Sequence, residues 1–360
     1  MTETVAGADR LDATAVRHTL DAVLTDFLDA KLKAAPGPEL STLITTLRCF
    51  LIGGKRLRPL LCVAGWYAGG GEGDTTGVIR AAAGLELFQA FALVHDDVMD
   101  ASDLRRGRPS AHRELAVAYA AGGGVRTRAD VHGVGAAILL GDLALVWSDE
   151  LLHTADRRTD RVTRVLELVD AMRNEVVYGQ YLDLLSAGRL FGDIEAAVRI
   201  ARYKTAKYTV ERPLHIGAAL ADAEPVVLEA CTAFALPLGE AFQLRDDLLG
   251  VYGDPAETGK PMTDDIREGK ATVLMALAAR RACGADLKLL QATIGNADVT
   301  AKDVERLRLI LDATGARRTV EQMIQHRREQ ALAVLDDAPF SPAAVRLLRD
   351  LAQKATVRRA

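Results

Sequence analysis

The chain has 360 residues, of which 49% are hydrophobic and 26% are charged, and its formal net charge is −4. A chain this long and this apolar buries a large core, which excludes an intrinsically disordered protein. The small negative charge excludes the broad basic field on which nonspecific nucleic-acid binding depends. Any anionic ligand must therefore be held by a local cluster of cations.

Cysteines and termini indicate the compartment. No two cysteines form a CxxC pair, which argues against a thiolate zinc site and for free thiols in a reducing environment. Residues 1–12 lack a basic head and an apolar core, so we predict a flexible N-terminus and no signal peptide. The longest apolar stretch, residues 133–147, contains Asp142 and is too short for a bilayer. We expect a cytoplasmic protein without a membrane span.

Apolar residues recur at helical spacing through most of the chain, and this pattern predicts an all-α protein. In chain order, the predicted helices span residues 13–33, 40–50, 76–100, 134–152, 159–186, 193–221, 226–251, 271–283 and 301–335. Glycine, proline and polar residues interrupt the pattern, but no interruption is long enough for an interdomain linker. We therefore predict one large helical domain over residues 1–360.

A first acidic cluster lies in the sequence LVHDDVMDASD. Asp96 and Asp100 are four residues apart and share one helix face, with Asp97 about 100° around the axis. Like charges at this spacing repel by roughly 0.2 to 0.5 kcal/mol per pair, and the C-terminal end of a helix disfavours anions. The cluster therefore predicts a compensating cation, with a solvated acidic helix end as the alternative.

A second acidic cluster, with Asp246 and Asp247 in FQLRDDLLGVYGD, follows another apolar helix. Carboxylates without cysteine or converging histidine suit hard cations, and Mg²⁺ typically bridges carboxylates to phosphate oxygens. Two such clusters predict a diphosphate site with several Mg²⁺ ions, between two acidic helix ends that face each other across a cavity.

Cationic side chains accompany both clusters, as expected for charge-assisted clamps on phosphate. They are Lys55, Arg56 and Arg58 in GGKRLRP, Arg105 and Arg106 after the first cluster, Lys204 in YKTAKYT, and Lys260 and Lys270 near the second cluster. Taken singly, each of these cationic residues has an alternative interpretation as a solvated surface side chain.

In their order, these motifs resemble those of the trans-isoprenyl diphosphate synthases, also called polyprenyl synthetases, over residues 51–270. The matching segments are GGKRLRP, ELFQAFALVHDDVMDASDLRRGRPSAH, AILLGD, GQYLDL, YKTAKYT, FQLRDDLLGVYGD and TGKPMTDDIREGK. The resemblance implies the isoprenoid synthase fold and condensation of isopentenyl diphosphate with dimethylallyl, geranyl or farnesyl diphosphate. It also implies three Mg²⁺ ions, replaceable by Mn²⁺, and a homodimer through long helices.

The resemblance assigns roles to individual residues of this chain. The metal ligands would be Asp96, Asp100, Asp246 and Asp247. The allylic diphosphate would be bound by Arg105, Lys204 and Lys260, with Lys270 nearby on a lid formed by residues 253–270. Isopentenyl diphosphate would be bound by Lys55, Arg58, Gln89 and Arg106. The Lys204 carbonyl, the Thr205 hydroxyl and the Gln243 amide oxygen would face the allylic cation. Gln180 and Asp183 would contact Lys204 or a metal-bound water, or else form an ordinary helix–helix hydrogen bond.

Two positions depart from the family pattern. Many relatives carry histidine in place of Gln89, and the second motif, usually DDxxD, here ends in Gly250. Gly250 leaves open a weakened third metal site, or a chain that is a catalytically silent subunit of a heteromeric synthase. A class I terpene cyclase is a further alternative, but such an enzyme has no use for GGKRLRP.

The residues four, five and eight positions before Asp96 predict the product length. They are Ala92, Phe91 and Phe88, on the helix that would line the growing prenyl tail. Farnesyl synthases of the ELxQAFF type carry aromatic residues at both the fourth and fifth positions. Since Ala92 lies about one turn from Asp96, its small side chain leaves room for roughly one more five-carbon unit. We predict geranylgeranyl diphosphate as the main product, with farnesyl diphosphate as the alternative.

Overall fold

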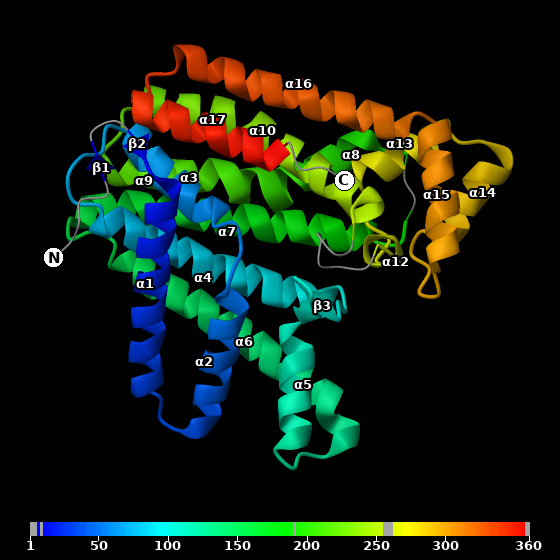
Figure 1. The fold of residues 1–360 in the computed structure, drawn as a ribbon, viewed down its shortest axis with the longest axis horizontal. Coiled ribbons are helices and arrows are strands. Elements are labelled where there is room, and N and C mark those ends of the chain that lie inside the picture. Colours follow the sequence, from blue (N-terminus) through cyan, green and yellow to red (C-terminus); the bar gives the residue numbers. More distant parts are fainter. Residues whose placement is uncertain (1–5, 8–9, 190–191, 255–261, 357–360) are drawn as a thin grey trace. The chain divides into compact units, whose positions relative to one another are not determined.

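The computed structural model describes residues 6–7, 10–189, 192–254 and 262–356 (Figure 1). The chain divides into two compact units, which are described separately. Unit 1 contains residues 1–166 and 216–223, and unit 2 contains residues 167–215 and 224–360. The single domain expected from the sequence, and the cavity between its two acidic helix ends, remain predictions.

Unit 1 is a helical bundle in which α4 packs against α3 and α6. A Cβ at Gly84 would lie 2.9 Å from Cγ of Leu152, so glycine lets α4 approach α6 closely. Ser148 donates a hydrogen bond of 2.7 Å to the Gly84 carbonyl at the same contact. The elements of unit 1 are β1 (Ala6–Gly7), β2 (Arg10–Leu11), α1 (Ala13–Lys33), α2 (Pro38–Leu51), α3 (Leu57–Ala68), α4 (Thr76–Met99), β3 (Leu104–Arg105), β4 (Arg108–Pro109), α5 (Ala111–Ala121), η1 (Arg126–Arg128), α6 (Ala129–His153) and parts of α7 (Thr159–Ser186) and α9 (Arg212–Leu220).

Unit 2 is built around α10, which packs against η2 and α16. A Cβ at Gly239 would lie 2.5 Å from Cα of Ala206, so glycine again permits the close approach of two helices. Besides the remainder of α7 and α9, the unit contains α8 (Ile194–Ile200), the π-helix η2 (Ala201–Glu211), α10 (Pro225–Tyr252), α12 (Asp264–Arg267), α13 (Val273–Arg281), α14 (Gly284–Thr293), α15 (Ala301–Ala313), α16 (Ala316–Asp337) and α17 (Pro342–Thr356).

The all-α prediction is confirmed, since the strands in the described part of the chain are two antiparallel pairs of two residues each. The observed helix boundaries differ from the predicted ones at positions where a tertiary contact or a single residue determines where a helix ends. The predicted helix 301–335 is two helices, because Gly315 adopts a left-handed conformation with φ of 68°. The predicted helix 193–221 is interrupted by η2. Helix α3 was not predicted, because it is buried on nearly every side and lacks a polar face.

In the part of the chain that the structure describes, three helical segments are long and apolar enough to cross a membrane, judged by length and composition alone: Thr76–Met99, Arg126–His153 and Pro225–Tyr252. The length argument against a span over residues 133–147 is therefore wrong, because the helix extends well beyond this stretch. Burial accounts for much of the apolar character of α4, where 67% of the apolar window is buried, but only 28% is buried in α6. The absence of a membrane span remains a prediction.

Candidate active site

The first acidic cluster lies at the C-terminal end of α4, and Arg105 supplies its compensating cation. Nε of Arg105 donates to both carboxylate oxygens of Asp97, at 2.9 and 3.1 Å, and Asp97 has no exposed surface. The guanidinium also lies 3.6 Å from Asp96. Burial favours the neutral form of Arg105, but the adjacent Asp97 carboxylate outweighs it and raises the pKa above its usual value. Arg105 therefore stays charged beside the predicted metal ligands Asp96 and Asp100.

A tight turn places the next arginine over the GGKRLRP loop. Arg106 adopts φ of 54° between β3 and β4, and a Cβ at Gly54 would lie 3.1 Å from its Nη2 atom. Burial lowers the pKa of Arg106, and the nearby guanidiniums of Arg56 and Arg58 add to the effect, against the carboxylate of Glu86. Arg106 and Arg58, from two separate motifs, thus lie near each other in unit 1, an arrangement suited to binding an anion.

Two other residues predicted to bind isopentenyl diphosphate belong to the same unit. Lys55 is exposed and directly follows Gly54, while Gln89 is half-buried on α4. Arg58 and Arg106 belong to this unit as well, and a common pocket for these four residues remains a prediction.

Arg56 differs from the other cations of its motif, because its guanidinium group is buried and donates hydrogen bonds to other groups of the protein. It is buried and donates to Glu86 at 2.6 Å and to the Leu51 carbonyl at 2.6 Å, and it forms an ion pair of 2.9 Å with Asp21. These contacts hold the loop in a conformation that gives Arg56 a positive φ of 51°. Arg56 is therefore a structural residue, and no local signal in the sequence separates it from Arg58.

The second unit brings together the residues predicted to face the allylic cation. Oγ1 of Thr205 donates to Oε1 of Gln243 at 2.5 Å, and Nε2 of Gln243 donates to Asp247 at 2.7 Å. Thr205 belongs to η2, a π-helix of a kind that is frequent at functional sites. The hydrogen bonds fix the orientation of the Gln243 amide and connect it to a predicted metal ligand.

Lys204 precedes Thr205 in η2 and is oriented by a carboxylate of α7. Its Nζ atom donates to Asp183 at 2.6 Å, which is one of the three alternatives that the sequence left open for this aspartate. The backbone of Lys204 also packs on Gly179, where a Cβ would lie 2.2 Å from the Lys204 nitrogen. Both contacts hold this part of η2 against α7.

The second acidic cluster extends beyond the pair Asp246 and Asp247, because Asp265 also lies close enough to affect the pKa of Asp247. Burial raises the pKa of Asp247 to about 7; the Gln243 amide acts in the opposite direction, and the carboxylates of Asp265 and Asp246 raise it further. Lys270 lies nearby, 3.4 Å from Asp265 and 2.6 Å from Glu268. Asp265 was not among the predicted site residues. Lys260 lies in residues 255–261, outside the described part of the chain, as does much of the predicted lid.

The polyprenyl synthetase family model matches residues 41–311, which is most of the chain. The chain belongs to this family. It is 35% identical to the geranylgeranyl diphosphate synthase of Mycobacterium tuberculosis over 82% of this chain and 78% of the relative. It is 33% identical to the geranylgeranyl diphosphate synthase of Saccharolobus solfataricus, over 71% of this chain and 72% of the relative. The crystal structure of geranylgeranyl pyrophosphate synthase from Corynebacterium glutamicum, complexed with isoprenyl diphosphate and magnesium, has a TM-score of 0.92, 39% identity and coverage of 97% of this chain and all of the other.

This polyprenyl synthetase is a short-chain trans-prenyltransferase, as the motifs implied. Membership in the family confirms the predicted enzyme class and fold. The roles assigned to individual residues remain predictions, and the geometry above is the structural support for them.

Within the synthetase, the predicted chain-length residues form an aromatic column on α4. Phe88 is fully buried, and the ring centroids of Phe88 and Phe91 lie 5.3 Å apart. Phe91 in turn packs edge-on against His95, with centroids 4.8 Å apart. A Cβ at Gly141 would lie 2.3 Å from the His95 ring, so this glycine of α6 makes room for the top of the column.

Ala92 lies beside this column and is half-buried. It is the position at which the ELxQAFF pattern would place a second ring. With alanine there, the packed rings of Phe88 and Phe91 remain the predicted barrier on this helix.

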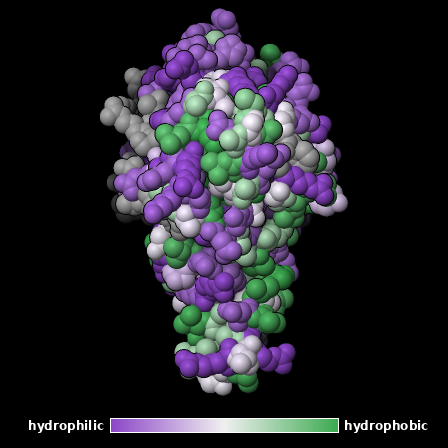
Figure 2. Space-filling model, turned by 90° about the vertical axis from the view of Figure 1, so that its right-hand side faces the viewer, coloured by the Kyte–Doolittle hydropathy of each residue, from purple (hydrophilic) through white to green (hydrophobic). Residues whose placement is uncertain are grey.

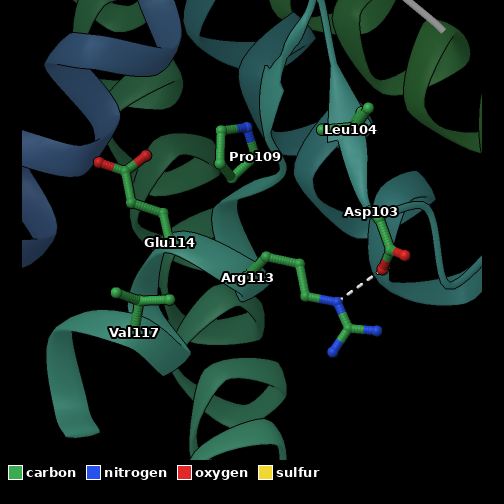
Figure 3. A pocket seen from close by; sticks show the side chains of 6 residues that line it. All are labelled: Asp103, Leu104, Pro109, Arg113, Glu114 and Val117. Atoms are coloured by element: carbon green, nitrogen blue, oxygen red, sulfur yellow. Dashed lines mark hydrogen bonds and ion pairs between the residues drawn. The ribbon is translucent and has the colours of Figure 1, made fainter.

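A surface hollow of about 430 Å³ lies beside the β3–β4 hairpin and α5 in unit 1 (Figure 3). Figure 3 shows the Arg113 side chain directed at Asp103, with which it forms an ion pair of 2.6 Å. None of the predicted site residues lines this hollow, and its arginine is already neutralised. The hollow is therefore not the candidate active site.

Among the described residues, no group of three or more His, Cys, Asp or Glu side chains is placed to hold a metal ion. This finding excludes a site built from protein ligands alone in that part of the chain. It agrees with Mg²⁺ chemistry, since Mg²⁺ is usually held by one or two carboxylates together with substrate phosphates. The donor sets at Asp96 and Asp100, and at Asp246 and Asp247, fit such a shared ion.

Proposed function

We propose that this synthetase condenses isopentenyl diphosphate with dimethylallyl, geranyl and farnesyl diphosphates, and releases geranylgeranyl diphosphate. The observation that carries this product length is the packed pair Phe88 and Phe91 with alanine at position 92. Relatives named geranylgeranyl diphosphate synthase support this product length. Another relative, 30% identical, is a geranylfarnesyl diphosphate synthase of Aeropyrum pernix, which is named for a longer product.

The reaction begins when the allylic carbon–oxygen bond breaks and leaves a carbocation and a diphosphate. Three Mg²⁺ ions, replaceable by Mn²⁺, would neutralise the leaving group, held by Asp96, Asp100, Asp246 and Asp247. Arg105 would bind the same diphosphate, because Asp97 holds its guanidinium charged and in place. Such fixed charges need no reorganisation during the reaction.

The carbocation would be stabilised by oxygen atoms of η2 and α10. The Thr205 hydroxyl and the Gln243 amide oxygen already lie within one hydrogen bond of each other. The double bond of isopentenyl diphosphate then attacks the cation, and a proton leaves to the released diphosphate. No side chain has to act as a nucleophile.

A homodimer through the exposed apolar face of α6 is part of the proposal. Large hydrophobic side chains on this helix are exposed at 37% to 70% of their surface; they are Val131, Val134, Ile138, Leu139 and Val146. Figure 2 shows hydrophobic side chains at the surface in the lower part of the view, the level of α5 and α6 in Figure 1. A contiguous exposed apolar face of this kind marks a protein or membrane contact.

We assign this face to a second copy of the chain, in a cytoplasmic enzyme. Size-exclusion chromatography with light scattering tests the assignment. The wild-type chain should be a dimer, and Leu139→Glu should be a monomer. Recovery of the wild-type protein in the membrane fraction of cells would instead support a membrane contact.

The product assay tests the enzymatic proposal itself. The purified chain alone, with Mg²⁺, labelled isopentenyl diphosphate and each allylic diphosphate, should yield a twenty-carbon diphosphate by mass. A fifteen-carbon product would favour a farnesyl diphosphate synthase. No condensation by the folded chain would favour a regulatory subunit, and a cyclic hydrocarbon would favour a terpene cyclase.

A further inference from the structure

The carboxylate of Glu240 has no part in the mechanism above, although it lies on α10 three residues before Gln243. Only 3% of Glu240 is exposed. Its Oε1 atom accepts a hydrogen bond of 2.8 Å from Nε of Arg202 and lies 2.6 Å from Nη2 of the same guanidinium. Its Oε2 atom lies 2.9 Å from Nη2 of Arg327. This buried carboxylate therefore joins three helices of unit 2, which are η2, α10 and α16.

The two arginines connect Glu240 to different parts of unit 2. Arg202 lies in η2, two residues before Lys204 and three before Thr205, whereas Arg327 lies in α16. The residues predicted to face the allylic cation are thus close to Arg202 in the chain, and α16 carries no predicted site residue. Since both arginine side chains are partly exposed, at 43% and 30%, the two ion pairs are similar in composition and burial. They differ in the helix that they hold.

The helix held by Arg202 has an uncommon hydrogen-bond pattern. The π-helical pattern of η2 covers 11 residues, Ala201–Glu211, between α8 and α9. At its end the Arg212 nitrogen donates to the carbonyl of Lys207, five residues earlier. Because π-helices are rare and mostly limited to single turns, tertiary contacts must stabilise this one. A change to α-helical bonding would rotate the central residues of η2 about the helix axis.

Close packing on α10 positions the middle of η2. Gly239 directly precedes Glu240, and a Cβ at this glycine would lie 2.5 Å from Cα of Ala206. One turn further along α10, Gln243 accepts the hydrogen bond of 2.5 Å from the Thr205 hydroxyl. In the sequence of α10, Glu240 lies between these two contacts. Its ion pair therefore acts on the same helix contact that orients Thr205.

A separate group of charges holds the other end of η2. Nζ of Lys207 lies 2.8 Å from Glu175 of α7 and 3.0 Å from Glu211. Oε1 of Glu211 accepts a hydrogen bond of 3.0 Å from Thr232 of α10. The residues predicted to face the cation thus lie between two groups of ion pairs, and Glu240 belongs to the group at the N-terminal end.

We propose that Glu240 is a positioning residue for the reaction. Through Arg202 it fixes the rotation of η2, and thereby directs the Lys204 carbonyl and the Thr205 hydroxyl toward the allylic cation. The proposal rests on the proposed carbocation mechanism, and Glu240 acts through η2 rather than on the substrate. The competing role is a purely structural link between helices, in which the two arginines would be equivalent.

Steady-state kinetics of Arg202→Gln and Arg327→Gln compares the two ion pairs, since each variant removes one arginine from the same carboxylate. Arg202→Gln should lower kcat roughly 10- to 100-fold, because a displacement of about 1 Å can cost about 100-fold in rate. The KM for isopentenyl diphosphate should change little. Arg202→Lys keeps the charge and should regain part of the kcat. Arg327→Gln, the matched control, should lower the Tm but leave kcat unchanged.

Hydrogen–deuterium exchange gives a measurement that needs no turnover, and circular dichroism checks that each variant is folded. Arg202→Gln and Glu240→Gln should both speed exchange in residues 201–211, whereas Arg327→Gln should not. The proposal is overturned if Arg202→Gln keeps the wild-type kcat, if exchange in η2 is no faster, or if Arg327→Gln lowers kcat equally. An inactive wild type, or a product of another length, would count against the proposed function, and exchange in η2 would then decide this inference by itself.

Discussion

Nε of Arg105 lies 2.9 Å from an oxygen of Asp97, a carboxylate with no exposed surface at the end of α4. The second aspartate of the first motif thus holds an arginine, while Asp96 and Asp100 remain the candidates for metal ions. Two adjacent aspartates of one motif have different tasks, because they lie on different sides of the helix.

Asp97→Ala should destabilise the fold as well as the site. Removing one partner of a buried ion pair leaves the other charge uncompensated, at a cost of about 3 to 5 kcal/mol. Urea denaturation should show a loss of this size, and the KM for the allylic diphosphate should rise in the folded fraction. An unchanged free energy of unfolding would show that Arg105 finds another partner.

Asp96→Ala and Asp100→Ala should abolish turnover with little effect on stability. Both carboxylates would have to be neutralised by the ion that binds the diphosphate, so removing either one should lower kcat by roughly 100-fold or more. Steady-state kinetics across a range of Mg²⁺ concentrations provides the measurement. Full activity of the wild type in excess chelator would contradict the metal requirement.

Lys55→Ala and Arg58→Ala should separate the two substrates. A lost charge-assisted hydrogen bond is worth about 1.5 to 3 kcal/mol, which corresponds to a roughly 10- to 100-fold rise in the KM for isopentenyl diphosphate. The KM for the allylic substrate should change much less and serves as the internal control. Equal changes for both substrates would refute the assignment of this pocket.

Substitutions around the aromatic column should change the product length. Ala92→Phe restores a second ring near the acidic pair and should shift the product to fifteen carbons. Phe91→Ala removes the barrier packed on Phe88 and should lengthen the product. Mass spectrometry of the products after phosphatase treatment gives the distribution, and no shift with either variant would show that another element limits the chain.

His215 should make the stability of the protein depend on pH. Burial lowers the pKa of His215 below 6.5, although Glu211 acts in the opposite direction, and Arg212 lowers it further. The unfolded chain therefore binds a proton more readily than the native protein, and stability is lost as the pH falls below about 6.5.

Comparison with His215→Gln isolates this contribution from that of other groups. Nε2 of the ring donates a hydrogen bond of 3.2 Å to the Leu228 carbonyl and lies 3.0 Å from Oγ1 of Thr232. Between about pH 7 and pH 5, the wild type should lose more thermal stability than the variant does. Parallel melting curves for the two proteins would contradict a depressed pKa.

Local geometry explains why the sequence alone determined the fold class and which acidic residues share a helix face. Helical spacing is a property of neighbouring residues, so the shared face of Asp96 and Asp100 and the proximity of Gln243 to Asp247 follow from intervals of four residues. The order of the motifs likewise determined the family. A buried helix such as α3 lies beyond this reasoning, because a segment surrounded by protein shows no polar face.

Tertiary structure decided the tasks of residues that look equivalent in the sequence. Arg56 and Arg58 stand two positions apart in one basic motif, yet only the packing of α4 beneath the loop shows that Glu86 binds Arg56. Gly250 looks like an ordinary helical glycine in the sequence, and only the structure shows that the Asp265 carboxylate occupies the space beside it. Both outcomes depend on contacts between segments far apart in sequence, where the free energy of burying and pairing a charge, rather than helix periodicity, selects the partner.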